Sequence, residues 1–505
     1  MFAQQSEEME QSKQSRRSFL KTGTGALGSL AFAIGADQLE TYAAENIAPG
    51  RQPNLVVFLG EGVRWDEFSC TGNSIIQTPN QDRIAREGIT FRNAFATYAL
   101  CAPSRASILT GLYTHTNGIV DNRMNQPIPR DIPLISDFLR QAGYEVAFLG
   151  KSHVKGGLRD RDWDYYFAFN GASTNYYNPV MWEGIAGQWS GPNTYEGYVD
   201  DLATDRALHW LDQKREKPFC LFLNFCAPHA PFYRPRRLLD LYNGVTIPKP
   251  ATFDDDLKHP PYPGKPGAVA QARNKIGTTI LGSDDPRTLE ELVKDHYAGV
   301  VDNDENIGRV LQWLERTGRL DETAIILTSD HGFFLGEWRM YDKRFMHEPS
   351  IRVPLMVRYP AMVKAGAVCE RMALNVDIAP TMLELAGIRV PPAVQGRSLV
   401  PLLKGESPDD WRKDWLYEYF EYPESQHVRP HRGVRTERYK LIHYHKLPQF
   451  PDLPEEFELY DLQNDPGELN NLHGQAGYDS LTRLLMDRIQ TLRKETQDHT
   501  TDATA

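Results

Sequence analysis

One cysteine of this chain stands in a setting that favours chemistry. Cys101 precedes Pro103 and Ser104, two residues that favour the first turn of a helix. Cys101 should therefore lie at a helix N-terminus, where free N–H groups and the helix dipole attract an anion. Arg105 adds a fixed positive charge nearby. The segment predicts a reactive side chain beside an anion site, and a buried cysteine before an ordinary helix is the alternative.

Two further segments place basic side chains at the ends of predicted strands. Lys151 and His153 follow a strand predicted over Tyr144–Leu149, and side chains two residues apart in an extended chain point to the same side. His229 follows an apolar run over Phe219–Phe225, and prolines on both sides stiffen its loop and hold an imidazole that can protonate a departing oxygen. A solvated turn and an ordinary strand-exit histidine remain the alternatives.

Apolar runs that alternate with helical patterns must position these residues. Strands are predicted over 55–59, 91–95, 144–149, 219–225 and 323–327, with helical patterns at 78–88, 134–142, 200–211 and 289–314. This alternation predicts an α/β fold with a mostly parallel sheet covered by helices on both faces. Ligands of such sheets bind beyond the carboxyl ends of the strands.

The character of the chain changes after about residue 405. Short strands predicted at 415–420, 439–445 and 457–460 precede a closing helix at 481–492. We therefore expect a catalytic domain over 50–404 and a smaller sheet-plus-helix domain over 405–497. Two stretches, 155–197 and 232–288, show little periodicity and are interpreted as walls or lids of a site, or as simple surface insertions.

The composition is that of a folded globular protein. Of its 505 residues 41% are hydrophobic and 24% charged, which excludes a disordered, collagen-like or polytopic membrane chain. The net charge of -11, without a long basic run, argues against a nucleic-acid partner. Five cysteines cannot form the disulfide framework of a small secreted domain.

The first residues resemble a twin-arginine signal. Arg16 and Arg17 precede an uncharged stretch rich in Gly and Ala, which is shorter than the roughly 20 apolar residues that span a bilayer. Ala43 and Ala44 offer a cleavage site, so residues 1–44 are expected to be a signal peptide, with a short membrane anchor as the alternative. The resemblance implies the twin-arginine export machinery as a partner, a periplasmic or extracellular location, and no stable membrane insertion of the mature chain.

The segment that begins at Cys101 resembles a family signature. It fits C-x-P-S-R-x-x-x-L-T-G of the formylglycine-dependent sulfatases, which belong to the alkaline phosphatase-like superfamily. Residues 143–153 resemble the second signature, G-Y-x-x-x-x-x-G-K-x-H, with Ser152 where relatives often carry tryptophan. In this family an enzyme oxidises the cysteine to formylglycine, whose hydrate attacks the sulfate ester. The resemblance therefore implies an alkaline phosphatase-like fold and a formylglycine-generating enzyme as partner.

The resemblance also implies roles for the other basic residues. Lys151 would hold the hydrated aldehyde, and His153 would take part in proton transfer at its second hydroxyl. His229 lies in a Pro-His-x-Pro segment that contacts the sulfate ester in the family. Lys343 lies in a stretch similar to the one that supplies a lysine to the sulfate and the leaving oxygen, where an ammonium neutralises developing charge.

The metal ligands depart from the family pattern. Asp330 and His331 resemble its metal pair, but the usual Asp-Asp after the first strand reads Glu61-Gly62 here. The implied ligands are Glu61, Asp330, His331 and the modified Cys101, with water in the vacant place and Asp66 as a remote substitute. We expect one divalent ion, Ca²⁺, with Mg²⁺ or Mn²⁺ as alternatives because one ligand is a histidine.

Taken together, the resemblance implies hydrolysis of sulfate esters in a sulfated small molecule or glycan. The local sequence from Phe333 to Pro360 looks nearest to glycan sulfatases such as glucosamine-6-sulfatases. One alternative is a phosphonate or phosphate ester hydrolase of the same superfamily. The other is a non-catalytic protein that binds sulfated glycans, which the glycine at position 62 suggests.

Overall fold

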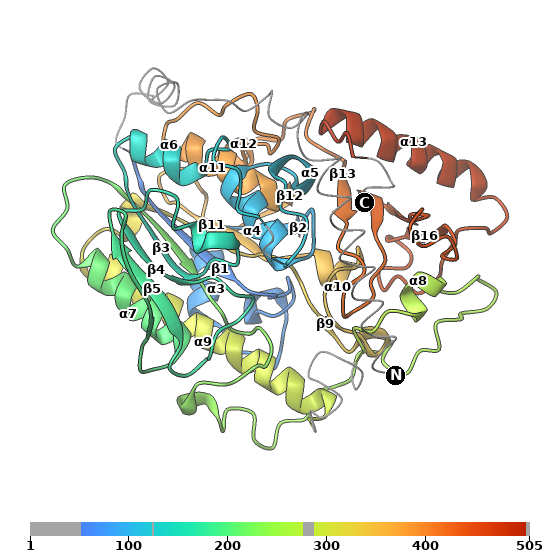
Figure 1. The fold of residues 1–505 in the computed structure, drawn as a ribbon, viewed down its shortest axis with the longest axis horizontal. Helices are drawn as coiled ribbons and strands as arrows, with labels where there is room; N and C mark the ends of the chain where they lie inside the picture. Colours follow the sequence, from blue (N-terminus) through green and yellow to red (C-terminus); the bar gives the residue numbers. More distant parts are fainter. Residues whose placement is uncertain (1–51, 124–125, 276–286, 501–505) are drawn as a thin grey trace.

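A computed structural model describes residues 52–123, 126–275 and 287–500 (Figure 1). The segment 1–44, with its predicted signal peptide, lies outside the described residues. Over the described ranges, no helix is both long enough and apolar enough to cross a membrane.

In the described part of the chain, ten strands form one large sheet in the order β12-β2-β11-β8-β1-β7-β3-β4-β5-β6. Strands β8, β1, β7, β3 and β4 are parallel to one another, as are β2 and β12, whereas β11 and β5 run against their neighbours. The bounds are β1 (Asn54–Gly60), β2 (Ile89–Phe95), β3 (Glu145–Lys151), β4 (Tyr165–Phe169), β5 (Val180–Ile185), β6 (Gln188–Thr194), β7 (Phe219–Asn224), β8 (Thr323–Ser329), β11 (Leu355–Arg358) and β12 (Ala367–Leu374).

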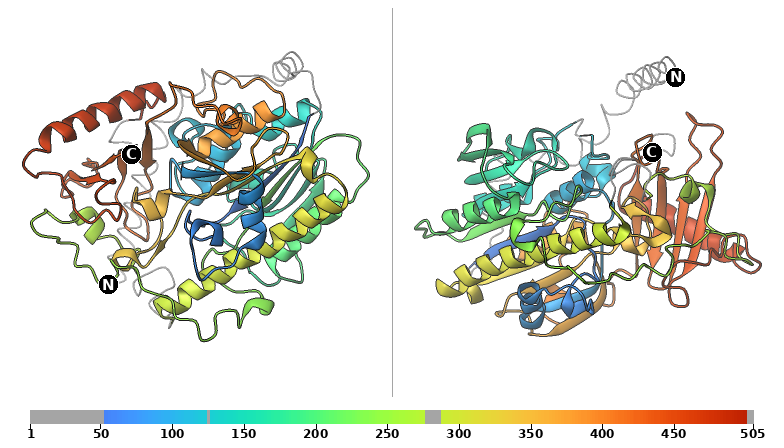
Figure 2. Two further views of the ribbon diagram at one scale, coloured as in Figure 1. Left: turned by 180° about the vertical axis from the view of Figure 1, so that it is seen from behind. Right: turned by 90° about the horizontal axis from the view of Figure 1, so that it is seen from below.

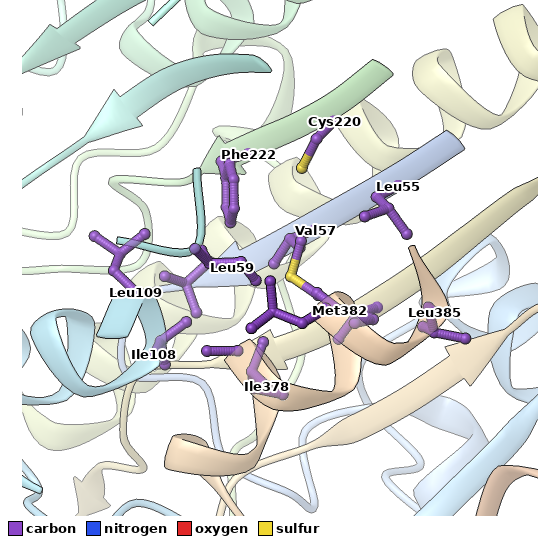
Figure 3. Packing of buried hydrophobic residues seen from close by; sticks show 14 of the residues in the cluster. Leu55, Val57, Leu59, Ile108, Leu109, Cys220, Phe222, Ile378, Met382 and Leu385 are labelled. Atoms are coloured by element: carbon purple, nitrogen blue, oxygen red, sulfur yellow. The ribbon is translucent and has the colours of Figure 1, made fainter. Parts of the chain in front are cut away.

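Helices cover both faces of this sheet because its central strands are apolar on both sides. Every residue of β1 is buried. Leu55, Val57 and Leu59 pack with residues of α4 and α11 on one face, as Figure 3 shows, and Val56 and Phe58 pack with α3, α7 and α9 on the other. These helices and α6 have the bounds α3 (Pro79–Glu87), α4 (Cys101–Thr110), α6 (Ile135–Gln141), α7 (Val199–Leu211), α9 (Leu289–Arg316) and α11 (Ile378–Leu385).

A second, antiparallel sheet lies beside the large one (Figure 2). It contains β13 (Asp414–Tyr419), β14 (His431–Thr436), β15 (Tyr439–Tyr444) and β16 (Glu456–Asp461), and α13 (Asp479–Glu495) packs on it. Phe95 of the large sheet stacks on Trp415 of β13 with ring centroids 5.3 Å apart. The two sheets therefore share one continuous apolar cluster.

Short elements connect these layers. They are α5 (Thr114–Asn117), α8 (Gly267–Ala270), α10 (Glu348–Ile351), α12 (Val400–Leu403), β9 (Phe334–Leu335), β10 (Tyr341–Asp342), and the 3-10 turns at Ser69–Thr71, Lys155–Leu158, Arg236–Leu238, Leu320–Glu322, Glu337–Arg339 and Asn375–Asp377.

The predicted fold class is confirmed, and one local prediction needs correction. The stretch 155–197 is not irregular, because it carries β4, β5 and β6 and widens the sheet. Thr78 precedes α3 but makes no capping hydrogen bond from its side chain. Asp304 of α9 instead accepts from the N–H groups of Asn80 and Gln81 at 3.0 and 2.8 Å. A carboxylate from a distant part of the chain therefore caps the start of α3.

Candidate active site

The predicted site residues converge beyond the carboxyl ends of neighbouring strands. Glu61 follows β1, Lys151 ends β3, and Asp330 and His331 follow β8, while Cys101 is the first residue of α4. All are buried. Because β3, β7, β1 and β8 are adjacent and parallel, their carboxyl ends bring these segments to one edge of the sheet.

Glu61 lies at the centre of the group. Its Oε1 is 3.1 Å from Sγ of Cys101, and its Oε2 is 2.7 Å from Nζ of Lys151 and 2.8 Å from Nη2 of Arg105. Burial raises the pKa of Glu61, but Lys151, His331 and Arg105 outweigh it and hold the pKa well below its usual range. Glu61 is therefore a carboxylate that links Cys101 to the surrounding cations.

Cys101 has the setting of an ionisable thiol. Burial and Glu61 raise its pKa, but Lys151, Lys343 and His331 outweigh them and lower it well below the usual value. Its place at the start of α4 adds the field of the helix N-terminus. Conversion to formylglycine would turn Cβ, which now bears Sγ, into the aldehyde carbon in the same positive surroundings.

Arg105 holds three segments of the site together. Its guanidinium donates to Glu61 at 2.8 Å, to Asp330 Oδ2 at 2.9 Å and to the carbonyl oxygen of Lys151 at 2.9 Å. Because one rigid fork reaches the ends of β1, β3 and β8, its removal would release three loops at once.

The two histidines lie in the site as neutral bases. Burial and the charge of Lys151 lower the pKa of His229, and burial lowers the pKa of His153 to about 4. Nε2 of His229 is 3.9 Å from Oε1 of Glu61. Nζ of Lys343 lies at the same distance from that oxygen. Every residue predicted to be catalytic is thus within the same cluster, although their roles in the reaction stay predictions.

The residues that the sequence suggested as metal ligands lie close enough to share one ion. Ligand atoms of Glu61, Cys101, Asp330 and His331 are all within 4.8 Å of one another. Burial and the nearby Glu61 raise the pKa of Asp330 to about 7, which reports repulsion between two buried carboxylates. A divalent cation relieves such repulsion, and oxygen donors suit a hard ion. The residues therefore fit the metal that the family implies.

The other residues considered for the ion lie differently. Asp66 is not part of the cluster, and its carboxylate pairs with Arg64 at 2.8 Å. Gly62 has a left-handed φ of +69°, and its N–H donates to Oδ1 of Asp330 at 3.1 Å. Glycine has no side chain, so position 62 contacts the candidate metal ligand Asp330 through its backbone N–H.

Some polar residues at the site were not found from the sequence. Asn122 lies with Nδ2 3.8 Å from Sγ of Cys101, and its Oδ1 accepts from the N–H of Ala102 at 3.0 Å. Asp342 and Arg344 flank Lys343, both with positive φ, and pair with each other at 2.8 Å. Asn122 stands in an irregular segment without any motif, so no local signal could have indicated it.

This fold and this site define an alkaline phosphatase-like hydrolase that acts on anionic esters. The buried Cys101 at the N-terminus of α4 is surrounded by Arg105, Lys151 and Lys343. The model of the family described as sulfatase matches residues 53–388, and the model of the C-terminal part of N-sulphoglucosamine sulphohydrolase matches 336–495. The chain belongs to the sulfatase family and is a sulfuric ester hydrolase.

Several relatives are similar over nearly the whole chain. An N-acetylglucosamine-6-O-sulfatase of Bacteroides thetaiotaomicron is 35% identical, over 94% of this chain and 92% of the relative. A solved structure of a protein in complex with its substrate, D-glucosamine-2-N,6-O-disulfate, has a TM-score of 0.80 at 34% identity and covers 90% of this chain and 100% of its own. A phosphonate monoester hydrolase of Agrobacterium radiobacter, with a TM-score of 0.70 at 24% identity over 88% of this chain and 96% of its own, shares the fold.

Proposed function

We propose that the protein removes sulfate from a sulfated glycan, with a 6-O-sulfated glucosamine unit as the substrate class. The convergence of Arg105, Lys151 and Lys343 on the buried Cys101 carries this proposal, since three fixed cations suit the charge of a sulfate ester. The similarity to the N-acetylglucosamine-6-O-sulfatase and to the structure with bound glucosamine disulfate supports the choice of sugar.

The nucleophile is proposed to come from Cys101. A formylglycine-generating enzyme would oxidise its thiol to the aldehyde, and the hydrated aldehyde supplies the hydroxyl that attacks sulfur. The positive surroundings that lower the pKa of the thiol also favour an ionised hydroxyl in its place. Lys151 holds this group from β3. After the sugar has left, the neutral His153 accepts the proton of the second hydroxyl while the C–O bond to the sulfate breaks, which releases sulfate and re-forms the aldehyde.

Glu61, Asp330, His331 and the modified Cys101 would hold one divalent ion. When bound, such an ion supplies positive charge beside the sulfate oxygens and favours ionisation of the nucleophile. Ca²⁺ is the proposed ion, with Mg²⁺ and Mn²⁺ as alternatives. Water would complete the coordination at the position where Gly62 provides no side chain.

The departing sugar oxygen requires a proton. His229 faces the site with Nε2, because its Nδ1 donates to the carbonyl oxygen of Ala230 at 2.7 Å. Lys343 neutralises charge on the sulfate and on the leaving oxygen. We assign charge neutralisation to Lys343 and proton donation to the imidazolium form of His229. In that form Nδ1–H keeps its bond to Ala230, and Nε2 takes up a proton from solvent and passes it to the leaving oxygen.

Polar groups beside Lys343 suit the hydroxyls of a sugar. Within the described residues, Nε of Arg344 and Oε2 of Glu421 are buried without a hydrogen-bond partner. Both atoms have a charged neighbour at longer range: Nη2 of Arg344 lies 3.5 Å from Oε2 of Glu421, and Nε of Arg344 lies 3.8 Å from Oε2 of Glu424. Buried donors and acceptors that lack partners are costly, and sugar hydroxyls would satisfy them. These two side chains are proposed to contact the ring that carries the sulfate.

The organisation of the chain is part of the proposal. Residues 1–44 would be a twin-arginine signal, so that the mature enzyme acts in the periplasm or outside the cell, and residues 50–404 and 405–497 would be the catalytic domain and its C-terminal partner. Twin-arginine export carries folded proteins, so Cys101 would be modified before transport.

Sulfate release distinguishes the proposed activity from its rivals. The purified enzyme is incubated with glucosamine 6-O-sulfate, an aryl sulfate, and the matching aryl phosphate and phosphonate esters, and released sulfate or phenol is measured. The proposal expects the highest kcat/KM on sulfates, including the sugar. Faster turnover of the phosphonate would favour the phosphonate hydrolase. Binding of the sugar without turnover, with formylglycine detected and metal supplied, would favour a non-catalytic glycan-binding protein.

A further inference from the structure

The loop that carries His229 is fixed by a buried carboxylate on a neighbouring helix. Asp200, in the first turn of α7, accepts hydrogen bonds from the N–H groups of Cys226 and Ala227, both at 2.8 Å. The side chain of Asp200 is fully buried. These two bonds fix the backbone immediately before the histidine.

Two further contacts hold the same loop. Asn303 of α9 donates from Nδ2 to the carbonyl oxygen of Ala227 at 2.9 Å. The hydroxyl of Tyr176 donates to the carbonyl oxygen of His229 itself. Side chains from separate parts of the chain therefore hold the backbone of the loop on both sides of the Ala227-Pro228 peptide.

Proton donation depends strongly on such restraint. With Nδ1 of His229 bonded to Ala230, the direction of Nε2 follows the backbone of the loop. A general acid works only within hydrogen-bond reach of the leaving oxygen. A displacement of about 1 Å can reduce the rate about 100-fold.

We propose that Asp200 is a positioning residue for the sulfatase reaction, acting through the backbone of Cys226 and Ala227 on the imidazole of His229. The inference rests on the proposed role of His229 as the acid. Asp200 does not touch the reacting group. Burial raises the pKa of Asp200 to about 7, against the effect of its two N–H donors. Burial of a carboxylate lowers the stability of the fold, and such a cost is expected where the group fixes the geometry of a functional site.

Substitution of Asp200→Asn removes half of this support while keeping the size of the side chain. The amide oxygen can accept from one N–H, but the amide NH₂ then faces the second N–H as another donor. The loss of charge also relieves the neighbouring Asp302, whose pKa is raised well above the usual value by burial and by Asp200. This relief limits the loss of stability, so the variant should fold.

The test compares two leaving groups. For glucosamine 6-O-sulfate we expect kcat/KM of Asp200→Asn to fall about 10-fold to 100-fold, mostly in kcat. For an activated aryl sulfate, whose phenolate departs without a proton, the change should be less than about threefold. In the double variant with His229→Ala, the substitution at Asp200 should add little, because both changes act on one group. Equal losses on the two substrates, or additive losses in the double variant, would overturn the inference.

Asp304 offers a matched control. It is also buried and also accepts from two backbone N–H groups, but it holds Asn80 and Gln81 at the start of α3. Asp304→Asn should lower stability, but its kcat/KM should not fall more on the sugar sulfate than on the aryl sulfate.

Tyr176→Phe removes the hydroxyl bonded to His229. Like Asp200→Asn, it should lose more kcat/KM on the sugar sulfate than on the aryl sulfate, and it serves as the test if Asp200→Asn does not fold. Turnover of glucosamine 6-O-sulfate by the wild-type enzyme is measured first. A wild-type enzyme inactive on every sugar sulfate would contradict the proposed function. If the wild-type enzyme is active on the sugar, equal losses of Asp200→Asn on the two substrates would contradict only the role of Asp200.

Discussion

Oε1 of Glu61 lies 3.1 Å from Sγ of Cys101, so the carboxylate that follows β1 touches the residue that begins α4. The two residues share the cations of the site, and Glu61 keeps its own ion pairs with Lys151 and Arg105 when the sulfur is removed. The nucleophile position can therefore be altered without leaving an unpaired buried charge.

We predict that Cys101→Ala abolishes turnover and changes the free energy of unfolding by only about 1 kcal/mol. Peptide mass spectrometry of the wild-type protein should find formylglycine at position 101. Activity on aryl sulfate and thermal denaturation of both proteins provide the measurements. Full activity of the alanine variant, or a fully active wild-type protein with an unmodified thiol, would refute the proposed nucleophile.

Gly62→Asp should tighten metal binding by restoring a carboxylate beside Asp330. A Cβ at Gly62 would lie 3.3 Å from Cε1 of His331 and Cδ2 of Phe333, at φ +69°, so some strain is expected. Asp tolerates this backbone region better than most residues.

Gly62→Ala is the control, since it adds the strain without the carboxylate. Thermal shifts with chelator and with added Ca²⁺, Mg²⁺ or Mn²⁺ measure the affinity, and an ion at about 100 times its Kd should add about 2.7 kcal/mol. Unchanged affinity in folded Gly62→Asp would contradict the placement of the ion.

His229→Ala should harm substrates with poor leaving groups selectively. General acid help is worth about 10²-fold to 10⁴-fold, so losses on sugar sulfate should exceed losses on activated aryl sulfate by a similar factor. Lys343→Ala should show a related bias together with weaker binding, because it neutralises charge on both the sulfate and the leaving oxygen. Values of kcat/KM for both substrates decide the matter. If His229→Ala loses equally on both, His229 only positions the sulfate.

Acid sensitivity should depend on His431 in the C-terminal sheet. Burial lowers its pKa to about 3 from an ordinary value of 6.5, so the folded protein keeps it neutral where the unfolded chain binds a proton. Stability should therefore be complete above about pH 6.5 and should fall as the pH decreases toward 3, by about 1.4 kcal/mol for each unit of pKa difference. In His431→Phe, stability at neutral pH should drop because the bond from Nδ1 to the carbonyl of Arg429 is lost, but the slope below pH 6.5 should flatten.

Urea denaturation at several pH values tests this prediction. The exposed His499 provides a control, because His499→Phe should keep the wild-type slope. An unchanged slope in His431→Phe would show that other groups cause the loss of stability in acid.

Glu458 of β16 should couple the C-terminal sheet to the loops that precede α8 and α10. Its Oε2 lies 3.2 Å from Nε2 of His347 and 3.4 Å from Nζ of Lys265, and all three side chains are buried. Glu458→Gln leaves Lys265 without its charge partner, which typically costs about 3–5 kcal/mol. We also expect residues 50–404 alone not to fold. Glu455→Gln, at a half-exposed partner of His443, is the control. Separate unfolding transitions for the two parts would contradict this coupling.

The parts of the fold that depend on local pattern could be predicted from the sequence. The apolar run of β1, the start of α4 at Cys101 and the strand before Asp330 follow from burial and helix-start preferences of neighbouring residues. The central position of Glu61 and the contact of Asn122 depend on loops that meet only in the folded chain. The cap of α3 by Asp304 likewise spans 223 residues, so no local rule could indicate it.

The complete burial of Cys101 has a consequence for the timing of synthesis. His331, which lies 3.4 Å from its sulfur, follows it by 230 residues in the chain. At about 5–20 residues per second, a ribosome needs about 10–50 s to make the intervening segment. Until then β8 and the segment of Lys343 do not exist, and the thiol stays open to another protein. Once the sheet closes, that access ends. The proposed oxidation of Cys101 therefore has to take place before the sheet closes around it.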